Sequence, residues 1–157
     1  MPRHVIEFIH VLLAFFYVGA VLTAHLNMLA VRRAETWAEK ASLLAVNRRA
    51  SLFIGFPALI LLGLAGNLLA MAAGYRMSDT PTFRIVNGLW LVNVLVAAVL
   101  DLPVTARLAT IARAAAANGG GEPVDWNSRV GQWRLGNALQ LLLFIAFLWL
   151  MAAPWHA

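Results

Sequence analysis

The chain has no cysteine in its 157 residues, and charged residues are scarce. The absence of cysteine excludes disulfides, thiolate metal sites, cysteine nucleophiles and covalent attachment of c-type haem. Charged residues make up 12% of the chain and hydrophobic residues 62%. A soluble domain usually carries about a quarter charged residues. Water is therefore not the main solvent around this chain.

Motifs of soluble hydrolases and nucleotide-binding proteins are also missing. The sequence has no Gly-x-Ser-x-Gly elbow, no His-Glu-x-x-His pair and no phosphate-binding glycine loop. Its net charge of +5 comes from arginines at the ends of apolar blocks, without a basic face of interleaved aromatic residues. This pattern indicates orientation in a lipid bilayer and no binding of nucleic acid.

Four apolar blocks approach the roughly 20 residues that a helix needs to cross a bilayer. We expect spans at about residues 5–31, 50–74, 83–100 and 130–153. The first block lacks a small-residue cleavage site, so we expect a retained helix and no signal peptide. Short loops make successive helices antiparallel. The predicted fold is all-α, an integral membrane up-down four-helix bundle, with residues 1–157 as a single transmembrane domain.

Two stretches outside these spans also have helical features. Residues 34–47 read as a short amphipathic segment that exposes Glu35, Glu39 and Lys40. The third span is expected to continue past Pro103 as a helix that reaches Ala117, followed by a loop at 118–123.

The basic residues predict the orientation of the bundle. Nine lie near the first and third loops, and three lie near the amino terminus and the second loop. The nine are Arg32, Arg33, Lys40, Arg48, Arg49, Arg107, Arg113, Arg129 and Arg134. Because basic residues favour the cytoplasmic side, we expect a multi-pass protein of a bacterial cytoplasmic (inner) membrane with both termini on the outer side.

A ridge of small residues runs along the second span. Gly66, Ala70 and Gly74 follow one another at four-residue spacing. Such a ridge lets another helix backbone approach closely, either within the bundle or in a homodimer or larger membrane complex.

Polar side chains inside the spans are informative, because an ionisable group at the bilayer centre costs about 2.5 to 3.5 kcal/mol on insertion scales. They fall into two layers. The outer layer holds His4, Glu7, His10, Asn67 and Asn87, and the inner layer holds His25, Asn27, Asn93, Asp101, Asn137 and Gln140.

His10 is the main candidate for chemistry in the outer layer. Glu7 is three residues before it, and Tyr17, seven residues beyond it, returns to nearly the same helical face. A carboxylate beside a histidine can fix its tautomer for metal ligation or proton transfer. The structural alternative is a buried histidine satisfied by Glu7 and an amide such as Asn67.

The inner layer has both functional and structural interpretations. His25 lies about 22 Å along the helix from His10, so the two cannot share a small ligand, and with Asn27 it can cap the cytoplasmic helix end. Asn93 and Asp101 form a polar stripe on the third helix. A second stripe on the fourth holds Trp133, Asn137 and Gln140.

Facing stripes can line a proton or substrate path, or they can join the helices by hydrogen bonds. In the second case Asp101 pairs with Arg134 or caps a helix that begins near Pro103. A copper site is a further alternative, because soft ligands gather toward the outer side. These are His4, His10, Met71, Met77, Met151 and His156.

Several short motifs occur in a fixed order along nearly the whole chain. They are Ile9-His10-Val11-Leu12, Gly19, Arg48-Arg49, Pro57, Gly63, Gly74-Tyr75, Asp101-Leu102-Pro103 and Trp133 with Gly136. In this order they resemble an uncharacterised bacterial family of predicted four-helix integral membrane proteins, a domain of unknown function.

The layout is more distantly similar to the copper-resistance D-type membrane domain and to haem-dependent membrane protoporphyrinogen oxidases. Both begin with a helix that carries a histidine at this point, and in the oxidases that histidine ligates haem. The resemblance therefore implies a haem-ligand role for His10. The oxidases also have a later second histidine and a lysine in the third helix, whereas here His25 falls earlier and the only lysine, Lys40, lies in a loop.

Three functions remain in competition. The first is a b-type haem protein with His10 as axial ligand and Glu7 as its orienting partner, for electron transfer or small-molecule oxidation. The second is a non-catalytic accessory or assembly subunit that docks on a larger membrane complex. The third is the handling of copper or a small solute.

Overall fold

The computed structural model describes residues 2–119 and 121–152, and within these residues it contains helices and no strands. Four of the helices are long and apolar enough to cross a membrane. They run over Arg3–Arg33, Trp37–Ala72, Pro81–Ala117 and Trp126–Ala152. The predicted all-α membrane fold is confirmed.

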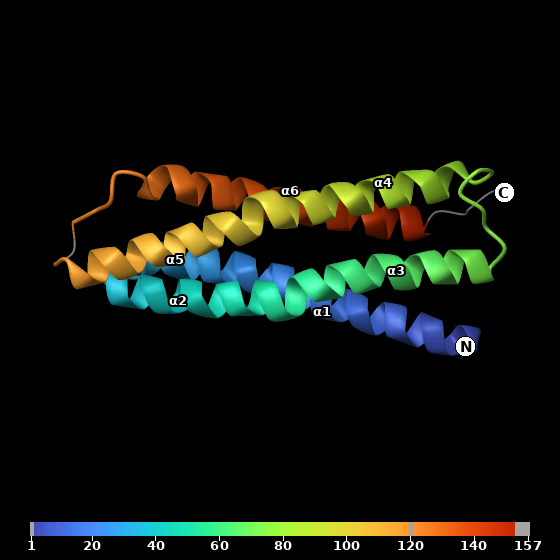
Figure 1. Ribbon diagram of the computed structural model, residues 1–157, viewed down its shortest axis with the longest axis horizontal. Coiled ribbons are helices and arrows are strands. Elements are labelled where there is room, and N and C mark those ends of the chain that lie inside the picture. The colour runs from blue at the N-terminus through green and yellow to red at the C-terminus, as the bar shows by residue number, and fades with distance from the viewer. Residues whose placement is uncertain (1, 120, 153–157) are drawn as a thin grey trace.

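Successive long helices run in opposite directions (Figure 1). The first is α1 (Arg3–Arg33) and the last is α6 (Trp126–Ala152). Each middle helix has two parts joined by a π-helical turn. These are α2 (Trp37–Ala50), η1 (Ser51–Gly55) and α3 (Phe56–Ala72), then α4 (Pro81–Leu95), η2 (Val96–Asp101) and α5 (Leu102–Ala117).

A proline follows each π-helical turn by two residues. Pro57 lies in the first turn of α3, and Pro103 lies in the first turn of α5. Proline has no N–H, so the carbonyls of Phe53 and Val99 lack their usual donor four residues on, and the proline ring crowds them. Widening to a π turn relieves this crowding and keeps both long helices continuous.

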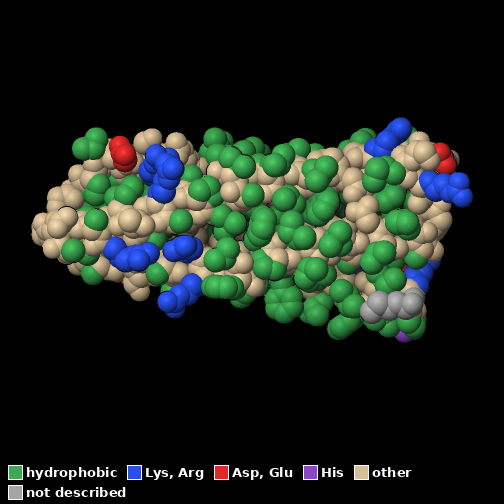
Figure 2. All heavy atoms as spheres, in the orientation of Figure 1, with side chains coloured by type: hydrophobic (Ala, Val, Ile, Leu, Met, Phe, Trp, Pro, Cys, Tyr) green, Lys and Arg blue, Asp and Glu red, His purple; other side chains and the backbone are tan. Residues whose placement is uncertain are grey.

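Apolar side chains cover the outside of the bundle between two groups of charged residues (Figure 2). On α1 the large exposed hydrophobic side chains extend from Phe8 to Leu29, and on α3 they reach Met71. An apolar surface this long suits the roughly 30 Å hydrocarbon core of a bilayer. The bundle is therefore built to face lipid along most of its length.

At the end away from the chain termini, α2 and α5 pack on each other beyond the predicted spans (Figure 1). Residues 37–47, expected as a separate amphipathic segment, are continuous with the second span. The predicted continuation of the third helix to Ala117 is confirmed. Thr36 begins α2 by accepting a hydrogen bond from the Glu39 amide at 3.2 Å.

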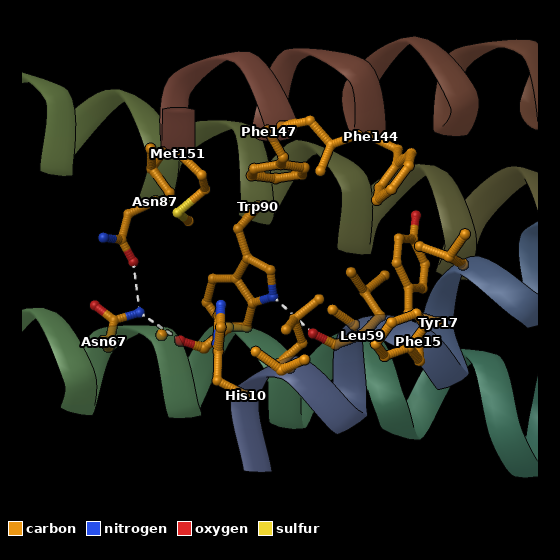
Figure 3. Close-up of a pocket in the computed structure, with 18 of the residues that line it drawn as sticks. His10, Phe15, Tyr17, Leu59, Asn67, Asn87, Trp90, Phe144, Phe147 and Met151 are labelled. Carbon is orange, nitrogen blue, oxygen red and sulfur yellow. Dashed lines mark hydrogen bonds between the residues drawn. The ribbon is translucent and has the colours of Figure 1, made fainter. Parts of the chain in front are cut away.

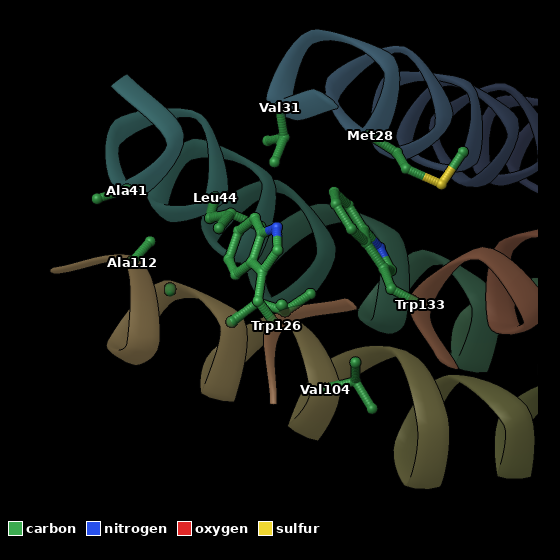
Figure 4. Close-up of a cluster of buried hydrophobic side chains, with 10 residues drawn as sticks. Met28, Val31, Ala41, Leu44, Val104, Ala112, Trp126 and Trp133 are labelled. Carbon is green, nitrogen blue, oxygen red and sulfur yellow. The ribbon is translucent and has the colours of Figure 1, made fainter. Parts of the chain in front are cut away.

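This helical extension has its own apolar core (Figure 4). Trp133 and Leu44 are fully buried there, and Ala109 and Ala112 let α5 approach α2 closely. The core consists of Met28, Val31, Ala41, Leu44, Val104, Leu108, Ala109, Ala112, Trp126 and Trp133. We refer to these residues as the extension core.

The small-residue ridge on α3 is used inside the bundle. Gly66 lies against the imidazole of His10 and Ala70 is buried, whereas Gly74 lies two residues beyond the end of α3 with a φ of 88°. Of the two roles predicted for the ridge, the structure shows close packing of α1 on α3.

We expect Trp133→Ala to lower the free energy of unfolding by about 3–5 kcal/mol, because it leaves a cavity in the extension core. Trp149→Ala is the matched control on the same helix, since Trp149 is 77% exposed and Trp133 is 0% exposed. Thermal unfolding of both variants in one detergent checks this. Equal losses of stability would show that Trp133 is not part of a packed core.

Candidate functional site

The half of the bundle near the chain termini contains a cavity of about 430 Å³. Helices α1, α3, α4 and α6 surround it, and most of its walls are apolar and aromatic (Figure 3). Its volume lies in the range of about 300–1,000 Å³ found for small-molecule and cofactor sites. The aromatic side chains that line it are Phe15, Tyr17, Phe83, Trp90, Phe144 and Phe147.

His10 extends from α1 into this cavity beside Asn67 and Trp90 (Figure 3). One edge of its ring lies against α3, near the Leu62 carbonyl. A Cβ built on Gly66 would stand 3.0 Å from Cε1 and 3.4 Å from Nδ1 of His10. Nδ1 is buried, yet it forms no hydrogen bond of normal geometry. The imidazole is therefore held against the α3 backbone, beside Gly66 and the Leu62 carbonyl.

Trp90 forms a fixed wall of the cavity. Its indole N–H donates a hydrogen bond to the Leu59 carbonyl at 3.0 Å. Its ring occupies the space in which a side chain at residue 63 would lie, so Gly63 admits it. Trp90 thereby joins α4 to α3 at the centre of the cavity.

Two amides close the outer rim of the cavity. Asn67 donates to the Asn87 side-chain oxygen and to the Gly63 carbonyl, both at 2.8 Å. Asn87 in turn donates to the Phe83 carbonyl at 2.9 Å. The amide of Asn67 is therefore bonded to α3 and α4, whereas the structural alternative paired it with His10.

Tyr17 lies at the inner end of the cavity. Its hydroxyl donates to the Asn93 side-chain oxygen at 3.1 Å and accepts from the Asn93 amide nitrogen at 2.7 Å. Both residues are buried. Tyr17 also lines a second, smaller pocket further in, so it separates the aromatic cavity from the inner polar layer.

Of the four residues predicted for the cofactor site, His10, Tyr17 and Asn67 line one cavity. Glu7 does not. Its carboxylate accepts a hydrogen bond from the Arg3 guanidinium at 2.8 Å, in an exposed ion pair. The structure therefore pairs Glu7 with Arg3, whereas the sequence analysis had predicted His10 as its partner.

Four residues of the inner polar layer are buried in the bundle. Asn93, Asp101, Asn137 and Gln140 are each at most 4% exposed. Tyr17, Asp101 and Gln140 line the second pocket, whose volume of about 20 Å³ admits a single water. The two predicted polar stripes therefore meet inside the bundle.

Asp101 has neither of the partners expected for it. Its side chain forms no cap at the start of α5, and no ion pair joins it to Arg134 in the part of the chain that the structure describes. The carboxyl faces the Trp133 indole, although Oδ1 and the indole nitrogen form no hydrogen bond of normal geometry. The Asp101 backbone carbonyl accepts the Thr105 hydroxyl.

Two of the α1 histidines, His10 and His25, belong to different surroundings. His25 lies in a groove with Arg32 and Arg134, on the opposite half of the bundle from the aromatic cavity. Its Nδ1 is buried without a hydrogen-bond partner. The prediction that His10 and His25 serve separate sites agrees with this placement.

The sequence matches a family described as a predicted integral membrane protein, DUF2269, over residues 4–154. The chain belongs to this family. No curated protein and no solved structure shows significant similarity to it. Membership of DUF2269 confirms the predicted resemblance to an uncharacterised membrane family. The more distant likeness to copper-resistance and haem-dependent oxidase domains stays a prediction.

The aromatic walls of the cavity in this DUF2269 chain were not expected from the sequence. Trp90, Phe144 and Phe147 read as ordinary residues of apolar spans, and nothing in their spacing separates a cavity wall from a lipid-facing surface. Met151 was considered only as a copper ligand. It lines the same cavity, and its sulfur points inward (Figure 3).

The residues considered for copper do not gather at one point. His10 and Met151 line the cavity, while His4, Met71 and Met77 do not. His156 lies outside the described residues. No group of three or more His, Asp or Glu side chains suited to a metal ion occurs in residues 2–119 and 121–152.

We expect Gly63→Ala to destabilise the protein by about 1–3 kcal/mol, because the new methyl group overlaps the Trp90 indole. Gly88→Ala on α4 is the matched control. Its methyl group enters open space, so we expect no loss and a gain of up to about 1 kcal/mol from helix propensity. Thermal unfolding measures both.

A double-mutant cycle separates this clash from a general effect on α3. In a Trp90→Ala background the cost of Gly63→Ala should largely disappear. An unchanged cost in that background would show that the Trp90 indole does not fill the space beside Gly63.

Proposed function

We propose that this DUF2269 protein binds b-type haem in the aromatic cavity, with His10 as an axial ligand, and that it acts in electron transfer or small-molecule oxidation. One observation carries the proposal. An imidazole is held against a helix backbone inside a large apolar cavity, and one of its nitrogens has no hydrogen-bond partner.

The residues present fit such a cofactor. Imidazole is a common axial ligand of haem iron, and apolar aromatic walls suit a flat macrocycle. Among the described residues, His10 is the only histidine that lines the cavity. Gly66 supports this role, since any larger residue there would press on the His10 ring.

Other residues of the cavity would serve the same site. Bound haem supplies a reversible one-electron iron couple. His10 would hold the iron, and Trp90, Phe144 and Phe147 would exclude water. Met151 brings a thioether, the second donor type that b- and c-type sites use, into the same cavity. Tyr17 and Asn93 would close the inner end with hydrogen-bonding groups.

The structural basis for an accessory subunit is weaker than the sequence indicated. The ridge at Gly66 and Ala70 faces the interior, and the polar stripe around Asp101 and Asn137 is buried. Both features that favoured docking on a larger complex are therefore occupied within one bundle. For copper handling, His10 and Met151 are the only two of the soft ligands within the described residues that line the aromatic cavity.

We expect the detergent-purified protein to show a Soret band that sharpens on reduction with dithionite. His10→Ala should abolish it, because that change removes the imidazole from the cavity. His25→Ala is the matched control on the same helix and should keep the band, since His25 lies in a separate groove. Absorption spectra of oxidised and reduced samples measure this.

A featureless spectrum at full protein loading, or a band that survives His10→Ala, would contradict the proposal. Stable co-purification with a larger complex and no chromophore would favour the accessory subunit. Met151→Leu extends the same experiment. A retained Soret band with altered reduced-state bands would assign the second axial position to Met151.

The proposal includes a place in the cell, which is a bacterial cytoplasmic membrane with both termini on the outer side. Two observations support it. The first and last residues of the described helical bundle lie at the same end (Figure 1). Nine of the 12 basic residues lie toward the opposite half or its loops.

Single cysteines in this cysteine-free chain test the orientation. Ser78 lies in the loop between α3 and α4, and Ser42 lies on the α2 surface at the other end, and both are exposed. In intact cells we expect a membrane-impermeant maleimide to label Ser78→Cys from outside. Ser42→Cys should react only after the membrane is opened. The reverse pattern would invert the orientation.

A further inference from the structure

A groove of about 480 Å³ runs between α1 and α6 in the half of the bundle away from the chain termini. Its basic side chains are His25, Arg32 and Arg134, and its apolar floor includes Leu29, Leu135 and Ala138. We refer to it as the α1–α6 groove. It shares no lining residue with the aromatic cavity, so a ligand of this groove would bind at a separate site.

The positive charge of this groove is not neutralised by the protein. Arg32 and Arg134 are both exposed. The ion pair found in the described residues joins Arg3 to Glu7, at the other end of the bundle. No acidic residue of the described part of the chain lines the groove. Two guanidinium groups therefore face the same open space without an anion.

The groove also has room beside these charges. A Cβ built on Gly131 would meet nothing within 4 Å, so the space next to Arg134 is open. Leu29 and Leu135 are 36% and 56% exposed, and Ala138 is exposed as well. The groove thus combines a basic end with an apolar strip along the lipid-facing surface.

We propose that the α1–α6 groove binds an anionic phospholipid. Its phosphate lies between Arg32 and Arg134, and an acyl chain follows Leu29, Leu135 and Ala138. Guanidinium groups bind phosphate oxygens in bidentate fashion, and basic pockets between membrane helices accept anionic headgroups. The apolar strip gives a lipid contacts that a free anion cannot make.

The position of the groove along the helices agrees with this ligand. Arg32 is in the last turn of α1, where that helix leaves its apolar stretch. On α6 the exposed apolar side chains begin at Leu135, next to Arg134. Both arginines therefore stand at the boundary of the apolar surface, the level at which a bilayer presents its phosphates.

Reconstitution into nanodiscs tests the proposal. One set contains phosphatidylcholine alone and the other contains phosphatidylcholine mixed with phosphatidylglycerol. We expect phosphatidylglycerol to raise the Tm by several degrees and to remain bound in native mass spectrometry. Arg32→Gln with Arg134→Gln should abolish the rise and weaken lipid retention by at least about tenfold.

Two further variants make the test specific. Arg48→Gln with Arg49→Gln removes the same charge from the exposed surface of α2, outside the groove, and should keep the lipid effect. Ala138→Phe keeps both arginines and fills the apolar strip, so it should reduce retention. Inorganic phosphate, added to phosphatidylcholine nanodiscs at the same total negative charge as the phosphatidylglycerol, should not raise the Tm.

Several results would overturn the proposal. An equal loss of lipid retention in the variant with Arg48→Gln and Arg49→Gln would show that the lipid is attracted to the basic surface in general and not to the groove. A phosphate effect equal to that of the lipid would make this a free-anion site. Unchanged retention in both groove variants would show that the groove holds no lipid. None of these outcomes depends on whether the aromatic cavity binds haem.

Discussion

A polar group removed from water without a hydrogen-bond partner costs free energy, and within a bilayer this cost decides where each polar side chain of the protein lies. The large side chains that face outward along α1 from Phe8 to Leu29 and along α3 are hydrophobic. The side chains of Tyr17, Asn93, Asn137 and Gln140 turn inward and are buried. Tyr17 with Asn93 joins α1 to α4, and Asn67 with Asn87 joins α3 to α4. These two side-chain pairs thus connect three helices across the bundle by hydrogen bonds.

The same cost identifies the unusual parts of the molecule. In the inner layer Asp101, Trp133 and Asn137 each keep a buried polar atom without a partner, and both polar atoms of the Asn47 amide are in this state. These residues lie close to the π-helical turns, where proline has removed a backbone donor from each middle helix. The second pocket has room for a water, which can satisfy two to four polar groups. In the outer layer the corresponding atom is Nδ1 of His10, whose ring lines a far larger cavity.

Much of the fold follows from composition, because bilayer thickness requires long apolar helices. The proximity of His10 and Tyr17 followed from helical periodicity, and that of His10 and Asn67 followed from their common depth. The partner of the Glu7 carboxylate could not be predicted from helical periodicity. Arg3 stands four residues before Glu7, and this spacing places the two side chains together on the helix as well as the spacing to His10 does. Because Glu7 pairs with Arg3 on the exposed surface, the His10 ring packs against the α3 backbone at Gly66.

The walls of the cavity were hidden for a different physical reason. In a soluble helix the buried face is apolar and the exposed face is polar, so spacing reveals the inside. Lipid removes this contrast. Phe147 lines the cavity and Trp149 is exposed two residues later, yet both are aromatic. The helical continuation to Ala117 was predicted, but the packing of α5 on α2 was not, because its close contacts use alanine, as at Ala109 and Ala112, which carries little hydrophobic signal.

The two halves of the bundle therefore differ in what holds them together. In the extension, Trp133 and Leu44 fill the space between helices, and alanines bring α5 onto α2. In the other half α3 and α4 are joined by the Trp90 indole and by the Asn67–Asn87 amide pair, and a cavity remains between the four helices. A cavity of that size forfeits dispersion contacts, which lowers the stability of this half unless other parts hold the helices in place. The extension core supplies that support from the far end of the same continuous helices. The aromatic cavity near the termini and the dense packing of the extension core are thus two consequences of one arrangement of long helices.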